Sequence, residues 1–147
     1  MVATNESLHE WMDEGFTSWA ESRAMASLFA DPMKPNENPH RWAYSSYINH
    51  HLSGKEEPLA THADHYKTNR AYGVAAYSKG EVLVEQLGAI VGEGVRDEGM
   101  RTYFRDWSFK HPGPTDFKRV MERESDLALD WYFLRNVVKN ASRLNAS

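Results

Sequence analysis

The sequence predicts an all-α protein with one helical domain over residues 1–139. Apolar residues recur at intervals of three and four along most of the chain, as on the buried face of an amphipathic helix. Clusters of proline, glycine and polar residues divide this pattern into segments of helical length. No segment of useful length alternates apolar and polar residues as a half-buried strand would. With 147 residues, the chain is long enough to bury one core.

The first half of the chain contains two expected helices and a long loop. The core-facing stripe of the first helix is Leu8, Met12, Phe16 and Trp19. Its candidate N-caps are Thr4, Asn5 and Ser7. The helix should end by Pro32, because the residue before a proline disfavours the helical region. A second helix is expected over Arg41–Leu52, and residues 54–69 are polar and aperiodic, which predicts a long ordered loop.

The second half contains four further expected helices. The third covers residues 73–91 and is interrupted by Gly92, and the fourth has the stripe Met100, Tyr103, Phe104 and Trp107. After a turn at residues 111–114, Thr115 is the expected cap of a short helix that holds Phe117, Val120 and Met121. Ser125 is the expected cap of the last helix, with Leu127, Trp131, Leu134 and Val138 on its core face. Residues 140–147 continue none of these patterns, so we expect a disordered tail or an expression remnant.

Composition excludes several classes of function. The formal net charge of −4 at pH 7 gives no basic footprint for nucleic acid. No apolar run reaches the length of a membrane span, and the N-terminus lacks the pattern of a secretory signal. The absence of cysteine excludes disulfides and thiolate zinc sites but leaves the compartment open. Any metal ligands must therefore be His, Asp or Glu.

A first candidate site lies on the polar face of the first helix. Glu14, Thr17, Ser18 and Glu21 share the face opposite the apolar stripe, which by itself is typical of a solvated surface. However, the run Asp13-Glu14-Gly15-Phe16-Thr17, with Trp11 before it and Glu21 after it, resembles the third-ligand helix of the aminopeptidase N-type zinc peptidases. In that family a His-Glu-x-x-His helix supplies two zinc ligands, and a glutamate from a second helix supplies the third. The resemblance implies that Glu14 is this ligand and that Thr17 and Glu21 are its outer partners.

A second motif resembles the same family at its catalytic tyrosine. Tyr77-Ser78-Lys79-Gly80 precedes an apolar helix, in the order relative to Glu14 that the family shows. The resemblance implies that Tyr77 donates a hydrogen bond to the oxygen that becomes negative during attack on the peptide carbonyl. Tyr72 is expected to form a pocket wall, Gly80 to leave space near the ring of Tyr77 for substrate, and Lys79 to be solvated or to assist packing.

The resemblance also identifies what this sequence lacks. The family's spacing would place the His-Glu-x-x-His motif before Met1, and the glycine-rich motif that binds the substrate's amino terminus would lie there too. We therefore expect a fragment, the helical subdomain of a thermolysin-like (gluzincin) catalytic domain, which is inactive alone. The parent would bind zinc and hydrolyse N-terminal residues from peptides, whereas this fragment would hold no zinc stably. The preferred substrate residue remains open.

Two other interpretations stay open from the residues alone. One is a non-catalytic helical interaction module. The other is a self-contained metal site built from His9, Asp13 and either His62 or His65, whose spacings are weak signals on their own. His50 and His51 are expected on the surface. A fragment should also expose an apolar face, so we expect self-association through the surfaces around Trp11, Trp19 and Tyr77.

Overall fold

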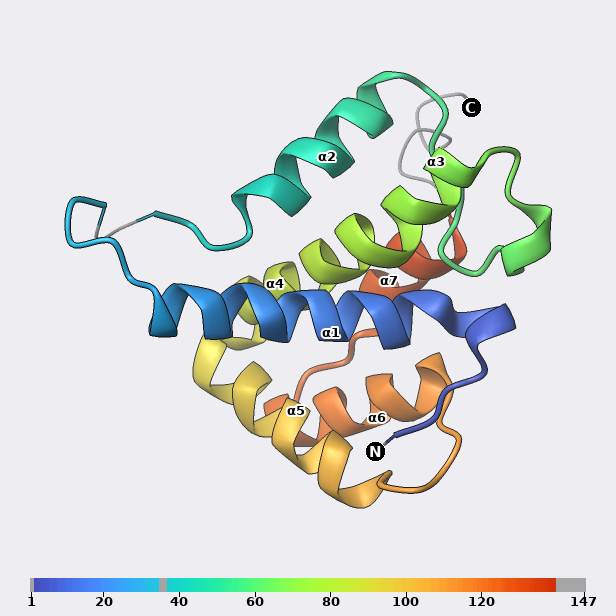
Figure 1. Cartoon of the computed structure of the whole chain (residues 1–147). Helices are drawn as coiled ribbons and strands as arrows, with labels where there is room; N and C mark the ends of the chain where they lie inside the picture. Colours follow the sequence, from blue (N-terminus) through green and yellow to red (C-terminus); the bar gives the residue numbers. More distant parts are fainter. Residues whose placement is uncertain (1, 35–36, 140–147) are drawn as a thin grey trace.

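The computed structural model describes residues 2–34 and 37–139, and all regular structure in these two ranges is helical (Figure 1). The all-α prediction is therefore confirmed. The α-helices are α1 (Glu6–Leu28), α2 (Arg41–Leu52), α3 (Asn69–Gly73), α4 (Gly80–Val91), α5 (Glu93–Asp106), α6 (Pro114–Ser125) and α7 (Asp130–Phe133). A 3₁₀ helix η1 (Ala63–His65) and two π-helical segments, η2 (Val74–Lys79) and η3 (Leu134–Val138), complete the described part. The tail expected at residues 140–147 lies outside it. Among the described helices, none is both long and apolar enough to cross a membrane.

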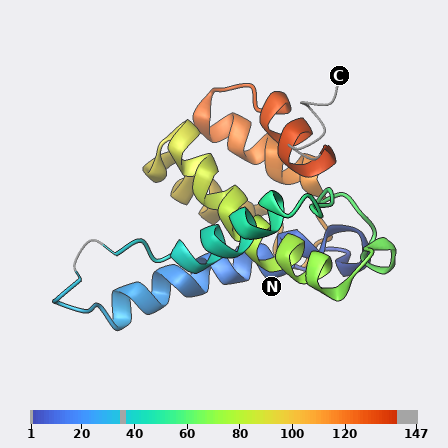
Figure 2. The same cartoon turned by 90° about the horizontal axis from the view of Figure 1, so that it is seen from above.

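The long helix α1 runs through the middle of the molecule, with α2 on one side and α5 and α6 on the other (Figure 1). Helices α3, η2 and α4 follow one another without a break, so the expected third helix begins four residues earlier than predicted and contains a π turn. The end of α1 and the start of α2 extend together from the body of the molecule in both views (Figures 1 and 2). This arrangement places α1 against both η2 and α4.

Aromatic rings from three helices form the centre of the core. The ring of Phe16 lies 4.7 Å from that of Phe117 and 5.8 Å from those of Trp11 and Tyr103, measured between centroids. Two of these contacts are close to perpendicular, the geometry that the charge distribution of aromatic rings favours. The predicted stripes of α1, α5 and α6 supply Phe16, Tyr103 and Phe117, whose core positions are confirmed. Leu8 and Phe104, which the same stripes placed in the core, are exposed, so those two predictions were wrong.

The C-terminal helix differs in register from the prediction. Leu127, Trp131, Leu134 and Val138, expected in the core, are exposed. The buried side chains of this segment are Leu129, Tyr132, Phe133 and Val137. No helix begins at Ser125, because α6 continues through it and stops at Asp126 in the left-handed conformation. A new helix begins at Asp130 and widens into a π turn, so the expected periodicity does not apply.

The start of α6 also differs from the prediction. Pro114, not a residue after Thr115, is the first helical residue, and Gly113 is the N-cap. The carboxylate of Asp116 accepts a hydrogen bond of 2.9 Å from the backbone N–H of Gly113. Proline suits this position because its missing N–H would have no partner there.

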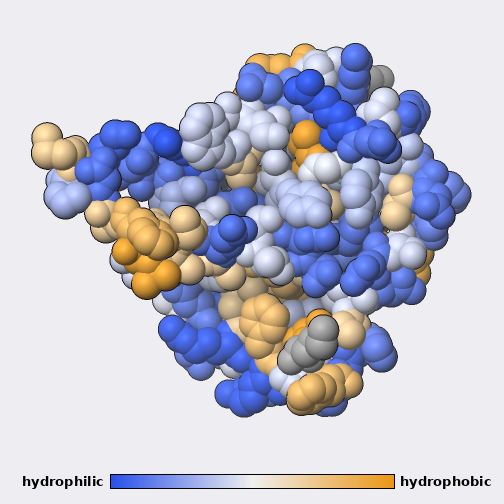
Figure 3. Space-filling model, viewed as in Figure 1, coloured by the Kyte–Doolittle hydropathy of each residue, from blue (hydrophilic) through white to orange (hydrophobic). Residues whose placement is uncertain are grey.

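Two surface predictions were wrong. Trp11 and Trp19 are buried in the core, so they offer no face for self-association, whereas Tyr77 is exposed. His50, which belongs to α2, is also buried. Figure 3 instead shows apolar side chains gathered where α1 ends. The exposed apolar residues of that end are Met25, Leu28 and Phe29.

Candidate functional site

Two glycines set the crossing of α1 over the η2–α4 helix. A Cβ atom on Gly15 would lie 2.6 Å from the Cα of Gly80, and one on Gly80 would lie 2.9 Å from the Cα of Gly15. Real Cβ atoms do not approach backbone so closely, so only glycine at both positions allows these helices to touch. Gly80 therefore makes room for α1 and not, as the sequence analysis expected, for a substrate.

This crossing brings Glu14 and Tyr77 together from opposite helices. Glu14 precedes Gly15 and is partly buried, while Tyr77 lies in the π turn before Gly80 with 44% of its surface exposed. The Glu14 carboxylate lies near enough to the Tyr77 hydroxyl to be the main cause of a raised pKa of Tyr77, although none of the described hydrogen bonds joins the two side chains. A phenol of ordinary or raised pKa is protonated at neutral pH, so Tyr77 can donate a hydrogen bond.

Tyr72 belongs to the same surface. Its pKa is raised first by burial and then by the negative charges of Glu10 and Glu14. Tyr72 also adds to the electrostatic environment of Tyr77. The structure therefore gathers Glu14, Tyr72 and Tyr77, three of the residues that the two sequence motifs singled out.

The self-contained metal site is not formed. The rings of His62 and His65 are tilted by 40° with centroids 5.0 Å apart, and His62 accepts a hydrogen bond from the backbone N–H of Asp64. His9 instead lies beside Gly113, and burial lowers its pKa. Within residues 2–34 and 37–139, no three His, Asp or Glu side chains come together as metal ligands would. That interpretation of the sequence was wrong.

Comparison with known proteins decides the family. A model described as "Peptidase family M1 domain" matches residues 1–137. The chain belongs to the M1 peptidase family. This confirms the resemblance to the aminopeptidase N-type zinc peptidases that the two motifs carry.

One solved structure shows the same fold. It is a mutant of the M1 zinc metallopeptidase from Deinococcus radiodurans, bound to a Tyr-Ser-Ala substrate. The two chains share 16% sequence identity with a TM-score of 0.70. The match covers 95% of this chain but only 30% of the other, so this M1 chain spans less than a third of that relative's length. A comparison with curated proteins gave no match.

The proposed outer partners of Glu14 have other neighbours in this M1 chain. Thr17 lines a small cavity together with Val2 and Phe104. Glu21 lines a larger cavity, of about 500 Å³, between the end of α1 and the start of α2. Neither Tyr72 nor Tyr77 lines these two cavities.

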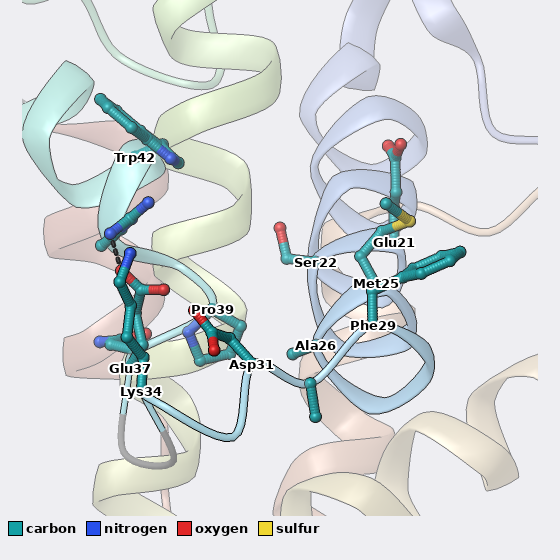
Figure 4. Close-up of a pocket in the computed structure, with 13 residues that line it drawn as sticks. Glu21, Ser22, Met25, Ala26, Phe29, Asp31, Lys34, Glu37, Pro39 and Trp42 are labelled. Atoms are coloured by element: carbon teal, nitrogen blue, oxygen red, sulfur yellow. Dashed lines mark ion pairs between the residues drawn. The ribbon is translucent and has the colours of Figure 1, made fainter.

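The larger cavity separates α1 from the segment that leads to α2. Figure 4 shows Ser22 and Ala26 of α1 on one side, with Glu37 and Pro39 on the other. Exposed Trp42 is part of its rim. The sequence motifs did not indicate this cavity of the M1 chain.

A buried ion pair behind Tyr77 was also missed by sequence reasoning. Lys79 was expected to be solvated or to assist packing, but only 4% of its surface is exposed, and its ammonium lies 2.6 Å from the Glu56 carboxylate. Burial lowers the pKa of Lys79, and Glu56 opposes that effect. Burial likewise disfavours the charge on Glu56, but Lys79 and His51 outweigh it, so the pKa of Glu56 lies below its ordinary value. Nothing in the residue order links Glu56 to Lys79.

Glu10 is a second buried acid that sequence reasoning did not identify. It is almost fully buried at the start of α1, and among the described residues neither of its carboxylate oxygens has a hydrogen-bond partner of good geometry. The nearby hydroxyl of Tyr66 donates to the carbonyl of Pro58 instead. Burial raises the pKa of Glu10.

Proposed function

We propose that this chain supplies part of the active site of a zinc aminopeptidase that removes N-terminal residues from peptides. Glu14 would be the third zinc ligand and Tyr77 the hydrogen-bond donor to the transition state. The observation that carries the proposal is the meeting of Glu14 with Tyr77 at the glycine crossing, in a chain of the M1 family.

The two side chains suit these tasks. Glu14 lies on α1 after the kink at His9, and its buried neighbours Gly15 and Phe16 fix the helix backbone that carries its carboxylate. In the complete site, zinc would act as the Lewis acid that activates water and polarises the peptide carbonyl. A phenol beside a metal ligand can reach a carbonyl oxygen held at that metal. The Tyr77 phenol is protonated at neutral pH, so it can donate a hydrogen bond to that oxygen as negative charge develops on it.

A single carboxylate is too few ligands for a stable zinc site, which takes three protein ligands in catalytic sites of this kind. The sequence contains no His-Glu-x-x-His motif, and the described residues form no three-ligand cluster. We therefore expect the isolated chain to hold no zinc through dialysis and to be inactive. Tyr72 would line the substrate pocket, and Thr17 and Glu21 would support Glu14 only through intermediate groups.

The test is to join this chain to a segment that carries the family's His-Glu-x-x-His helix. The joined protein should hold one zinc and hydrolyse amino-acid anilides. Glu14→Ala should lose both zinc and activity, whereas Glu98→Ala, at an exposed position on α5, should lose neither. Tyr77→Phe should lower kcat by about 10²–10³ with zinc content unchanged, as for the loss of one oxyanion donor. Tyr44→Phe on α2 is the matched control, and full activity of either site variant would refute the assignment.

A non-catalytic interaction module is the second candidate. The observation that favours it is the exposed apolar surface around Met25, Phe29 and Trp42, beside the larger cavity. We expect this surface, and not the buried Trp11 and Trp19, to drive self-association of the isolated chain. Light scattering on a size-exclusion column would measure it. A joined protein that binds zinc but hydrolyses no anilide would favour the module over the enzyme.

A further inference from the structure

The Glu56–Lys79 ion pair lies directly behind the turn that carries Tyr77. We propose that Glu56 and Lys79 are positioning residues, which hold the π turn so that the Tyr77 hydroxyl faces Glu14. This inference rests on the function proposed above for Tyr77. It extends that function to two residues that touch neither Glu14 nor the ring of Tyr77 in any described contact.

The ion pair is well satisfied and almost fully buried. Besides the 2.6 Å contact with Lys79, the Glu56 carboxylate accepts a hydrogen bond of 3.2 Å from the Tyr47 hydroxyl and lies 2.5 Å from Nδ1 of His51. Only 7% of Glu56 is exposed. Tyr47 and His51 both belong to α2, so Glu56 connects the helix behind η2 to the η2 backbone through Lys79.

The turn is held from two sides at neighbouring residues. Gly80 contacts the backbone of α1 in front, and Lys79, one residue earlier, is anchored to Glu56 behind. A hydrogen bond of 3.0 Å between the hydroxyls of Ser78 and Ser46 adds a second connection to α2. Tyr77 itself is 44% exposed, so packing around its ring does not fix it. Its direction is therefore set by the backbone that Lys79 anchors.

Stability alone does not explain a buried ion pair. Removing two charges from water costs several kcal/mol each, and replacing such pairs with apolar residues is often neutral or stabilising. A π turn is also an uncommon helical form that is frequently found at functional sites. The ion pair of Lys79 with Glu56 favours the π turn over a regular α-helical turn, in which the Tyr77 side chain would point in another direction.

The first experiment uses the chain itself and needs no activity. Nuclear Overhauser contacts between the ring protons of Tyr77 and the side chain of Glu14 measure their approach. Lys79→Met should remove these contacts, and the exposed-lysine control Lys67→Met should keep them. The double variant Glu56→Gln/Lys79→Met leaves no unpaired buried charge, so it should fold even where the single variant does not. Unchanged contacts in a folded double variant would overturn the proposal.

The second experiment separates positioning from general stability in the joined zinc enzyme. The double variant should lower kcat about tenfold or more, with KM and zinc content unchanged, because a displacement of about 1 Å can cost up to 10²-fold. In a Tyr77→Phe background the same change should cost nothing further, since the group that it positions is gone. Additive losses would overturn the proposal. If Tyr77→Phe alone has no effect, the function proposed for Tyr77 fails, and the contacts measured in the isolated chain still decide whether the ion pair positions the ring.

Discussion

The close approach of Gly15 to Gly80, where α1 crosses the η2–α4 helix, predicts that a side chain at Gly15 lowers the free energy of unfolding. In Gly15→Ala the new methyl would lie 2.6 Å from the Cα and 2.8 Å from the carbonyl carbon of Gly80, whereas ordinary van der Waals contact begins at 3.4 Å. A third neighbour, the carbonyl oxygen of Ala76, lies at 3.1 Å. All three are backbone atoms of a helix, so no side chain can rotate away. The helices must separate, which also moves Glu14 away from Tyr77.

The expected magnitude follows from two opposing effects. Overpacking of this kind costs about 1–3 kcal/mol, and contact with rigid backbone places Gly15→Ala at the upper end. The higher helix propensity of alanine returns about 1 kcal/mol. We therefore expect a net loss of about 2 kcal/mol, or a decrease of about 4–8 °C in Tm for a chain of this size.

Gly73→Ala is the matched control. Gly73 has helical backbone angles, and a Cβ there would meet nothing within 4 Å. That variant should gain about 0.5–1 kcal/mol, because it loses only the flexibility of glycine in the unfolded chain. Urea unfolding followed by circular dichroism should thus separate the two variants by about 3 kcal/mol. Equal stabilities would refute the close approach of Gly15 to Gly80.

Two further predictions concern other buried or strained positions. The folded state favours the protonated form of Glu10, so its contribution to stability is present below its ordinary pKa of 4.5 and is lost as pH rises through the raised pKa. Glu10→Gln should therefore gain stability over the natural chain between pH 4 and pH 8 in urea titrations, and a constant difference would contradict this. Gly92 has φ 93° and ψ 138° with open space around its Cβ position, so Gly92→Ala should cost about 1–3 kcal/mol from backbone strain alone. Gly94→Ala, also in open space but without a positive φ, should show no such loss in thermal unfolding.

The helices of this chain were predictable where a single regular period decides them. The α2 helix has the expected bounds, and α1 begins at one of the expected caps, Asn5, whose side chain accepts a hydrogen bond from the N–H of Ser7. The C-terminal register was not predictable in this way. It depends on a left-handed Asp126 and on a π turn in η3, and neither changes the apolar spacing enough to be recognised in the sequence.

The candidate site shows the same division. Glu14 and Tyr77 were indicated by their local motifs, but their contact depends on Gly15 and Gly80 meeting across 65 positions of the sequence. A glycine inside a helix normally lowers the stability of that helix. Only the backbone that faces Gly15 and Gly80 shows why glycine is needed at these positions. The sequence therefore indicated Glu14 and Tyr77 but not the contact between Gly15 and Gly80 that brings them together.

Charged residues gave the least reliable predictions, for a physical reason. A lysine on a helix is normally solvated, because burying its charge without a partner is prohibitively costly. Lys79 is buried because Glu56 lies within 2.6 Å of it, and Glu56 belongs to a loop with no periodic pattern. The partner of Lys79 thus lies in a loop whose sequence has no periodic pattern from which the burial of Lys79 could be predicted. A buried charge of this kind implies a specific partner, and at Lys79 that partner lies behind the turn that directs Tyr77 toward Glu14.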